Sequence, residues 1–423
     1  METLLRSTAS ICPICKKRIN AQLTSIRDKI YLHKTCPVHG NFSTLTWKGL
    51  IDFEEWCAGA SHDDPSEAPD CPQKCGLCEH HLQAVCCVLL EITSRCNLHC
   101  AFCFADKKSS PDASIETVKR WLTDLVQPGE TLVQLSGGEP TLRDDLPDII
   151  AAAKEAGCAY VQLNTNGIRF AQDSAYAMDL KQAGLSFVFL QFDGMDDKVY
   201  LALRGRELLD IKQKAIEHCA QANLGVTLVP MLVPSVNMDQ LGAMLRYAVS
   251  WSPVVRGIHF QPVTYMGRTQ RLPTNDDRVT LDELFYQLVI QSDGLITQRE
   301  LFPSCCDHPQ CGFHGDFIVM PDAELLPLSR RGKPRETCCS SKSKAKANRS
   351  FIARRWERKL VANDSKEINT LDGFLKRVRS HGFTITAMAF QDAWTLDLTR
   401  LRNCSLHVYQ RGRFVPFCSN YID

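Results

Sequence analysis

The residues best suited to chemistry are three cysteines on one short stretch, Cys96, Cys100 and Cys103, at the spacing C-x3-C-x2-C. They follow the apolar run 88–92, at the point where the chain turns polar. Three thiolates on one tight loop can ligate three irons of a cubane [4Fe–4S] cluster and leave the fourth iron open for chemistry. The alternatives are a zinc knuckle without its fourth ligand and unrelated core thiols.

A second apolar run, residues 131–135, ends in the turn Ser-Gly-Gly-Glu-Pro. Because Gly137 and Gly138 lack side chains, backbone groups at this strand end can approach a ligand closely. We expect that ligand to be the amino and carboxylate end of S-adenosylmethionine, with Glu139 part of the same turn. Taken alone, such a turn is an ordinary loop.

The three-cysteine loop and the Gly-Gly-Glu-Pro turn together resemble the radical SAM superfamily. The resemblance implies that S-adenosylmethionine chelates the open iron and that the glycine-rich strand end holds its amino group. Phe102, directly before the third cysteine, fits the same pattern. Asn164 and Asn166, after a later apolar run, are candidates to reach the ribose or carboxylate of the cofactor, although Asn-Gly is also an ordinary turn signal.

Length and composition indicate a soluble protein of two or three domains. The chain has 423 residues and a net charge of +1, which gives no indication of nucleic-acid binding. No signal peptide is visible at the first residues, and the apolar stretches are too short to span a bilayer. The 21 cysteines include C-x2-C pairs, so metal ligation in a reducing cytoplasm is favoured over disulfides.

Residues 1–60 are predicted to form a rubredoxin-like metal-binding module. Cys12 and Cys15 form one knuckle, and Cys36 and His39 form a second. Four N/S ligands on two knuckles make a closed tetrahedral site, which suits zinc or a single iron. A lone reactive cysteine pair is the alternative. Residues 29–33 alternate as a short strand between the knuckles.

Residues 61–87 are predicted to be an acidic linker followed by an auxiliary iron–sulfur segment. Cys71, Cys75 and Cys78 repeat the spacing of the first triplet, and Cys86 lies close behind them. A fourth thiolate would close a [4Fe–4S] cluster and leave no open iron. A zinc site is the competing interpretation.

Residues 88–300 alternate apolar runs with stretches of helical period, which predicts an α/β fold with a parallel sheet. The expected strands are 88–92, 132–135, 160–163, 187–192, 226–233 and 258–262. The expected helices are 115–126, 146–156, 209–222 and 238–249. Six repeats match the partial (β/α)6 barrel of the radical SAM core, in which function concentrates at the strand carboxyl ends. Arg204, after the fourth strand, is either an anion-binding or a solvated arginine.

Residues 301–423 are predicted to be a C-terminal auxiliary-cluster region. A second auxiliary cluster could form from two early and two late thiols: Cys306, Cys311, Cys404 and Cys418. Substitutes for these ligands are Cys305, Cys338 and Cys339. Between them, residues 330–359 hold twelve Lys/Arg and two acidic residues, which indicates a solvated surface or a contact with lipid head groups.

The order of cysteine blocks over nearly the whole chain resembles the archaeal tetraether lipid synthases and their bacterial relatives, a family that includes a radical SAM methylase of a hydroxymethylpterin. The resemblance implies the metal sites proposed above: one radical SAM cluster, one or two auxiliary [4Fe–4S] clusters and a mononuclear module. It also implies reductive cleavage of S-adenosylmethionine to a 5′-deoxyadenosyl radical, with a flavodoxin or ferredoxin as electron donor.

Three functions follow from these patterns. The first is radical C–C bond formation on lipid chains, with peripheral membrane contact, which predicts a long apolar channel beside the basic stretch. The second is radical methylation of a pterin or another small heterocycle, which predicts a compact polar pocket. The third is a metal-binding scaffold without catalysis.

Overall fold

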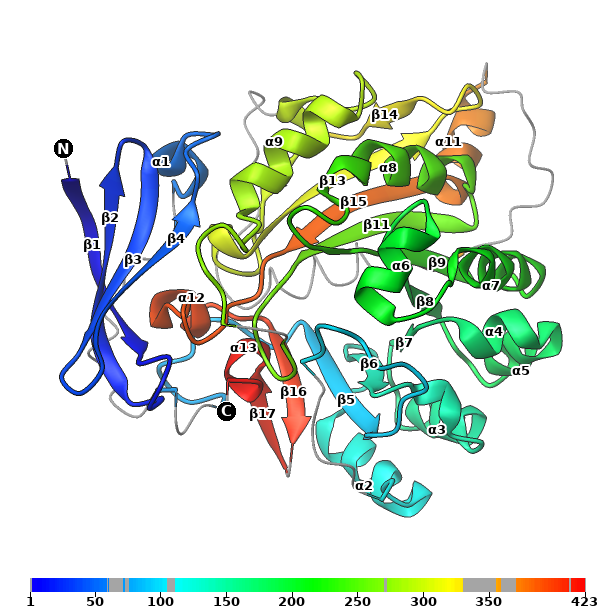
Figure 1. The fold of residues 1–423 in the computed structure, drawn as a ribbon. Coiled ribbons are helices and arrows are strands. Elements are labelled where there is room, and N and C mark those ends of the chain that lie inside the picture. Colours follow the sequence, from blue (N-terminus) through cyan, green and yellow to red (C-terminus); the bar gives the residue numbers. More distant parts are fainter. Residues whose placement is uncertain are drawn as a thin grey trace.

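The computed structural model places two separate sheets side by side (Figure 1). It describes residues 2–58, 60, 71–72, 76–104, 111–269, 272–329, 355–358, 370–410 and 412–422. A four-stranded sheet holds the N-terminal residues, and a larger sheet of 13 strands holds most of the remaining chain. The expected site residue Cys75 lies outside the described residues, as do Cys338 and Cys339 and most of the basic stretch.

The N-terminal sheet is an antiparallel meander that brings two of its three turns to one end. Its strands are β1 (Glu2–Ile11), β2 (Arg18–Ile26), β3 (Lys29–Cys36) and β4 (Gly40–Trp47), followed by the short helix α1 (Phe53–Trp56). The expected strand 29–33 is confirmed, and in β3 alternate residues are buried, as a strand with one covered face requires. The β1–β2 and β3–β4 turns therefore lie at the same end of the sheet.

Six parallel strands form the barrel part of the large sheet. They are β5 (Cys87–Thr93), β6 (Leu132–Gly137), β7 (Tyr160–Thr165), β8 (Phe187–Gln191), β9 (Gly225–Val229) and β11 (Val255–Pro262). Each pairs in parallel with the next in chain order. The α/β fold with a partial barrel is thus confirmed. Pro230 has no N–H donor, and the expected strand 226–233 is divided there into β9 and β10 (Met231–Leu232).

Helices cover the outer face of the parallel strands (Figure 1). They are α2 (Ile115–Leu125), α3 (Leu146–Glu155), α4 (Ile168–Gln172), α5 (Ser174–Gln182), α6 (Asp197–Arg204), α7 (Leu209–Gln221), α8 (Leu241–Ser250) and α9 (Leu281–Gln291). In α2, Ser114 caps the first turn, and Val118, Leu122 and Leu125 make the buried face. The four expected helices are present. Helices α4 to α6 have at most nine residues each, too few for a clear period in the sequence.

The chain beyond residue 300 supplies both edges of the large sheet. Its strands are β12 (Phe302–Pro303), β13 (Gly312–Val319), β14 (Leu325–Pro327), β15 (Gly382–Met388), β16 (Leu406–Gln410) and β17 (Arg413–Pro416). Strand β15 pairs in parallel with β11, and β16 pairs in parallel with β5. Helices α11 (Leu371–Ser380), α12 (Leu398–Arg402) and α13 (Phe417–Asn420) accompany these strands. The C-terminal region therefore encloses the barrel from both sides.

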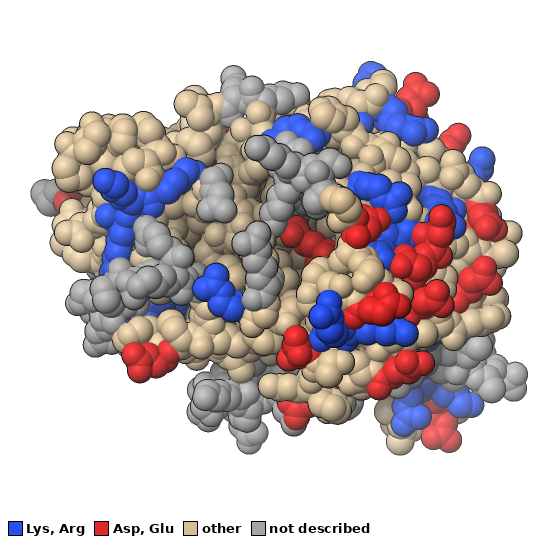
Figure 2. Space-filling model, turned by 90° about the horizontal axis from the view of Figure 1, so that it is seen from below, with Lys and Arg blue, Asp and Glu red and all other residues tan. Residues whose placement is uncertain are grey.

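The surface carries both signs of charge. In Figure 2, Asp and Glu side chains lie among Lys and Arg over the right half of the face seen from below. Across the described parts of the chain, no helix is long and apolar enough to cross a bilayer.

Candidate active site and metal centre

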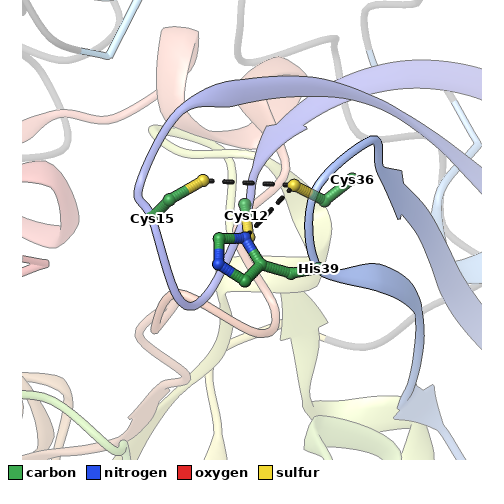
Figure 3. Close-up of side chains that lie close together, drawn as sticks. All are labelled: Cys12, Cys15, Cys36 and His39. Atoms are coloured by element: carbon green, nitrogen blue, oxygen red, sulfur yellow. Dashed lines mark hydrogen bonds between the residues drawn. The ribbon is translucent and has the colours of Figure 1, made fainter.

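The two N-terminal knuckles form a four-ligand site (Figure 3). The ligand atoms of Cys12, Cys15, Cys36 and His39 all lie within 4.8 Å of one another. Nδ1 of His39 is 3.5 Å from the sulfurs of both Cys12 and Cys36, and the sulfurs of Cys15 and Cys36 are 4.0 Å apart. Tetrahedral zinc would place two sulfurs about 3.8 Å apart and sulfur and nitrogen about 3.5 Å apart. The residues therefore fit a closed tetrahedral metal site.

The cysteine triplet follows the carboxyl end of β5 and lies on a loop fixed to the barrel. The N–H of Ala101 donates to the carbonyl of Leu203 over 3.0 Å, and Cys103 and Arg268 exchange two backbone hydrogen bonds of 3.1 and 2.9 Å. Cys96, Cys100 and Cys103 all line one cavity of about 410 Å³. Three thiols that face a shared cavity fit a three-cysteine cluster with an open iron.

Gly137 and Gly138 allow the end of β6 to pack directly against the start of this loop. A Cβ at Gly137 would lie 2.1 Å from the carbonyl oxygen of Thr93, and a Cβ at Gly138 would lie 2.1 Å from that of Arg95. The N–H of Gly138 donates to Thr93 over 2.8 Å. Both glycines line the cavity, as expected for cofactor-binding residues, and their close approach also fixes the cysteine loop.

Glu139 is a buried carboxylate that joins two strand ends. It accepts hydrogen bonds from the N–H and hydroxyl of Thr141 (3.1 and 2.7 Å), which begin the turn η2 (Pro140–Leu142). It also accepts from the Thr165 hydroxyl and the Asn166 N–H, both over 2.7 Å. The four protein donors give Glu139 a clear role in positioning β7 against β6.

The other expected cofactor residues also line the cavity. The Asn166 side chain donates to Asn97 over 2.7 Å, next to Cys96, whereas Asn164 accepts from Gln162 over 2.7 Å. The ring of Phe102 packs edge-on against Tyr265 with 5.8 Å between centroids. Phe102, Asn164 and Asn166 are thus brought to the same cavity as the triplet.

Sequence reasoning did not identify the buried ion pair at the end of β8. Arg204 is not solvated: it donates two hydrogen bonds of 2.7 Å to Asp193, and it lines the cavity. Burial opposes the charge of Arg204, but the Asp193 carboxylate outweighs that effect and raises the arginine pKa. The position of Asp193 directly after an expected strand could have indicated that its carboxylate faces the site.

Lys212 is a second buried cation that the sequence analysis did not identify. Its ammonium group is buried and donates to the carbonyl of Asn166 over 2.5 Å, and burial lowers its pKa to about 8. It shares a helix face with Ala215 and Ile216. A lysine on the apolar face of α7 was the signal that could have identified it.

The remaining cysteines gather near the cavity and behind it. Cys306 is in hydrogen-bond contact with both Cys86 and Cys305, and all three line the cavity. Cys311 accepts a hydrogen bond from Arg400 over 3.5 Å, and Cys418 lies within electrostatic range of the same guanidinium group. Cys404 lies within electrostatic range of Cys311 and Cys418, and its pKa is raised by burial. Cys71 is buried in the same apolar cluster as Cys418, and Cys78 is exposed.

Comparison with known proteins identifies two segments. Residues 90–248 match the family model described as the radical SAM superfamily. Residues 4–48 match the model described as the HMPTM N-terminal zinc ribbon domain.

One curated relative matches along nearly the whole chain. The 7,8-dihydro-6-hydroxymethylpterin dimethyltransferase of Methanocaldococcus jannaschii is 33% identical over 470 residues, which cover 98% of this chain and 93% of the relative. A probable GTP 3′,8-cyclase of Methanococcus maripaludis is 29% identical over 41% of this chain and 58% of its own length. Among solved structures, native anSMEcpe with bound AdoMet aligns with a TM-score of 0.41 at 17% identity, over 49% of this chain and 60% of that one.

Proposed function

The chain belongs to the radical SAM superfamily and, within it, to the family of the 7,8-dihydro-6-hydroxymethylpterin dimethyltransferase, and on this premise we propose that it methylates a small planar heterocycle of the pterin class. The near full-length match to that relative carries the proposal. The chain is a radical SAM enzyme, and the choice of substrate is the proposed step.

The size of the cavity suits a compact substrate. A volume of about 410 Å³ lies in the range of small-molecule sites. Polar side chains of Gln134, Asn164 and His259 line it beside aromatic rings. Of the basic stretch that was expected to face lipid, the described residues 355–358 include a buried tryptophan, Trp356. Most of the basic stretch lies outside the described residues, so the expected solvated or lipid-facing surface stays a prediction.

Different residues of the cavity wall contribute to binding of the cofactor in different ways. When bound at Cys96, Cys100 and Cys103, an iron–sulfur cluster supplies the electron that splits S-adenosylmethionine into methionine and a 5′-deoxyadenosyl radical. The close-packed glycines and Glu139 hold the surrounding backbone in place. Arg204 and Asp193 form a buried ion pair at the cavity wall, which holds this part of the wall in place without adding net charge.

We extend the proposal to the other metal sites and to the electron donor. Three thiols lie together at the cavity wall: Cys86, Cys305 and Cys306. They support an auxiliary cluster beside the substrate whose ligands come both from the predicted segment 61–87 and from the predicted C-terminal region. Cys311, Cys404 and Cys418 support a second auxiliary cluster. The zinc-ribbon match favours zinc in the N-terminal site. A flavodoxin or ferredoxin would deliver the electrons.

The proposal is tested with anaerobically reconstituted protein, reductant, S-adenosylmethionine and a hydroxymethylpterin, in soluble extract that supplies the methyl source. We expect 5′-deoxyadenosine and a pterin heavier by one or two methylene units. Replacing Cys96, Cys100 and Cys103 with alanine should abolish both products. The matched control is Cys158→Ala, a buried thiol outside the cavity. Formation of 5′-deoxyadenosine without any modified pterin, in extract that supports turnover, would contradict the substrate assignment.

A further inference from the structure

The amino-terminal end of the barrel is closed by residues 355–358, which come from far along the chain. Trp356 lines the cavity together with Leu132, the first residue of β6. The backbone of this segment crosses the start of β9 so closely that a Cβ at Gly225 would lie 2.1 Å from the carbonyl oxygen of Trp356. Arg256 donates to the carbonyl of Arg355 over 2.6 Å, which fixes the segment to β11. The segment therefore forms a floor to the cavity.

Three rings gather at this floor. The Trp356 ring packs edge-on against Phe189 with 4.8 Å between centroids. The Phe189 ring also lies 5.7 Å from the ring of His259, at a tilt of 39°. All three rings also line the cavity, so each presents part of its surface to a ligand. Aromatic faces and edges favour contact with a flat ring system.

Two threonines of β15 hold two of these rings in place. The indole N–H of Trp356 donates to Thr384 over 2.8 Å. Nδ1 of His259 is 2.8 Å from the hydroxyl of Thr386, its partner residue in the parallel β11–β15 pairing. The two threonines are two residues apart, so both point to the same face of the strand. The tertiary structure thus fixes the ring orientations before any ligand arrives.

The contact with Thr386 occupies one of the two ring nitrogens of His259. Nδ1 is engaged by the Thr386 hydroxyl over 2.8 Å, and either atom can be the donor in this contact. Nε2 has no hydrogen-bond partner within the described part of the chain. Burial lowers the pKa of His259 to about 4, which keeps the ring neutral at physiological pH.

We infer that Phe189, His259 and Trp356 form the subsite that receives the flat ring of the substrate, with Nε2 of His259 forming a hydrogen bond to the polar edge of that ring. This inference rests on the proposed function and narrows it to flat heteroaromatic rings with a hydrogen-bonding edge. Thr384 and Thr386 are positioning residues, because they act on the substrate through Trp356 and His259.

The test measures binding of 6-hydroxymethylpterin to the reconstituted enzyme by equilibrium dialysis under anaerobic conditions, with geranylgeraniol as the lipid-like probe. Loss of ring stacking in Trp356→Ala should weaken pterin binding roughly 10-fold or more. His259→Phe keeps a ring but removes Nε2, so about a 5-fold to 10-fold loss is expected. If Trp356→Ala fails to fold, Thr384→Val keeps the indole and removes only its hydrogen-bond partner. Thr386→Val tests the same dependence for His259.

The matched control is Thr227→Val. Thr227 is a buried threonine of β9, the strand next to β11, and its hydroxyl has no hydrogen-bond partner in the described structure. It should bind pterin like the wild type. Unchanged pterin affinity in both His259→Phe and the Trp356 or Thr384 variant would overturn the subsite. So would a wild type that binds geranylgeraniol but not pterin.

Methyl transfer is measured on the same preparations, which separates the proposed ring subsite from the proposed methyltransferase function. Binding of pterin that depends on Trp356 and His259, without methylation, would support the subsite and contradict the proposed function. Methylation by the wild type, with full affinity retained in the variants, would support the function and contradict the subsite.

Discussion

At the scale of single residues, Glu139 links the cofactor turn to the next strand. Its buried carboxylate accepts four hydrogen bonds from Thr141, Thr165 and Asn166. Glu139→Gln would place an amide N–H₂ against donors, and at least one buried group would lose its partner. We expect about 1–3 kcal/mol of lost stability, measured by denaturant unfolding. Affinity for S-adenosylmethionine should fall as well, because Asn166 and the cysteine loop shift together.

A matched control separates the two effects of this substitution. Glu300 is also buried and serves a capping box in the turn η4 (Gln298–Glu300), outside the cavity. Glu300→Ala removes the side-chain acceptor of the capping box, so it should lower stability without changing cofactor affinity. Equal loss of affinity in both variants would show that Glu139 acts only through global stability.

The buried His259 should make the stability of the protein depend on pH. In the unfolded chain this histidine takes up a proton below about pH 6.5, whereas in the folded protein burial lowers its pKa to about 4. The unfolded state therefore binds more protons between these values, and stability is lost as the pH falls through this window. The loss from this group is at most about 3 kcal/mol, since part of the ring faces the cavity. His259→Phe should remove it, so unfolding free energies at pH 7 and pH 4.5 should differ less in the variant. Parallel pH curves for the two proteins would contradict the assignment.

The sequence revealed residues whose chemistry needs a local motif and missed those whose role depends on distant contacts. The triplet of Cys96, Cys100 and Cys103 and the two glycines lie on single loops, so their spacing was sufficient. Arg204 was visible but its partner Asp193 was not, because burial decides whether an arginine is solvated or paired. Trp356 was hidden within a basic stretch, where the charges indicated an exposed surface.

At the scale of elements, the parallel strands depend on chain segments beyond the predicted barrel. The sequence predicted six strands from apolar runs because each run is local. It gave no sign that β15 would pair with β11 and β16 with β5, since strand partners are set by long-range packing. These two strands cover edges that would otherwise present unpaired backbone groups.

A fragment of residues 88–300 should therefore fail to fold, although it contains all six parallel strands. We expect it to aggregate or to show unfolded amide signals by NMR, because the edges of β5 and β11 are both exposed in it. A chain that lacks only residues 1–48 keeps both edge strands and should retain more structure. A soluble, cooperatively folded 88–300 fragment would show that β15 and β16 are dispensable.

At the scale of the whole molecule, the N-terminal metal module is tied to the C-terminal end of the chain. Arg6 of β1 pairs with Asp397, which also caps α12. Lys34 of β3 donates to the carbonyl of Ala393 over 2.7 Å, and Lys16 donates to that of Ile422 over 2.6 Å. The first and last parts of the sequence therefore support each other, and Cys418 of α13 is buried in one apolar cluster with Ile11 of β1 and Leu89 of β5.

The Arg6–Asp397 pair gives the strongest test of this coupling. Burial alone would raise the pKa of Asp397, but Arg6 and the Thr8 hydroxyl lower it to about 2. Arg6→Met leaves a buried carboxylate without its cation and should cost roughly 3–5 kcal/mol. Asp397→Asn should cost less, because the amide oxygen still accepts from Thr8 and Arg6 can reach water. The double variant should then be more stable than Arg6→Met alone, as measured by thermal unfolding and by proteolytic release of the N-terminal module. If the two losses instead add, the ion pair does not couple the module to the C-terminal region.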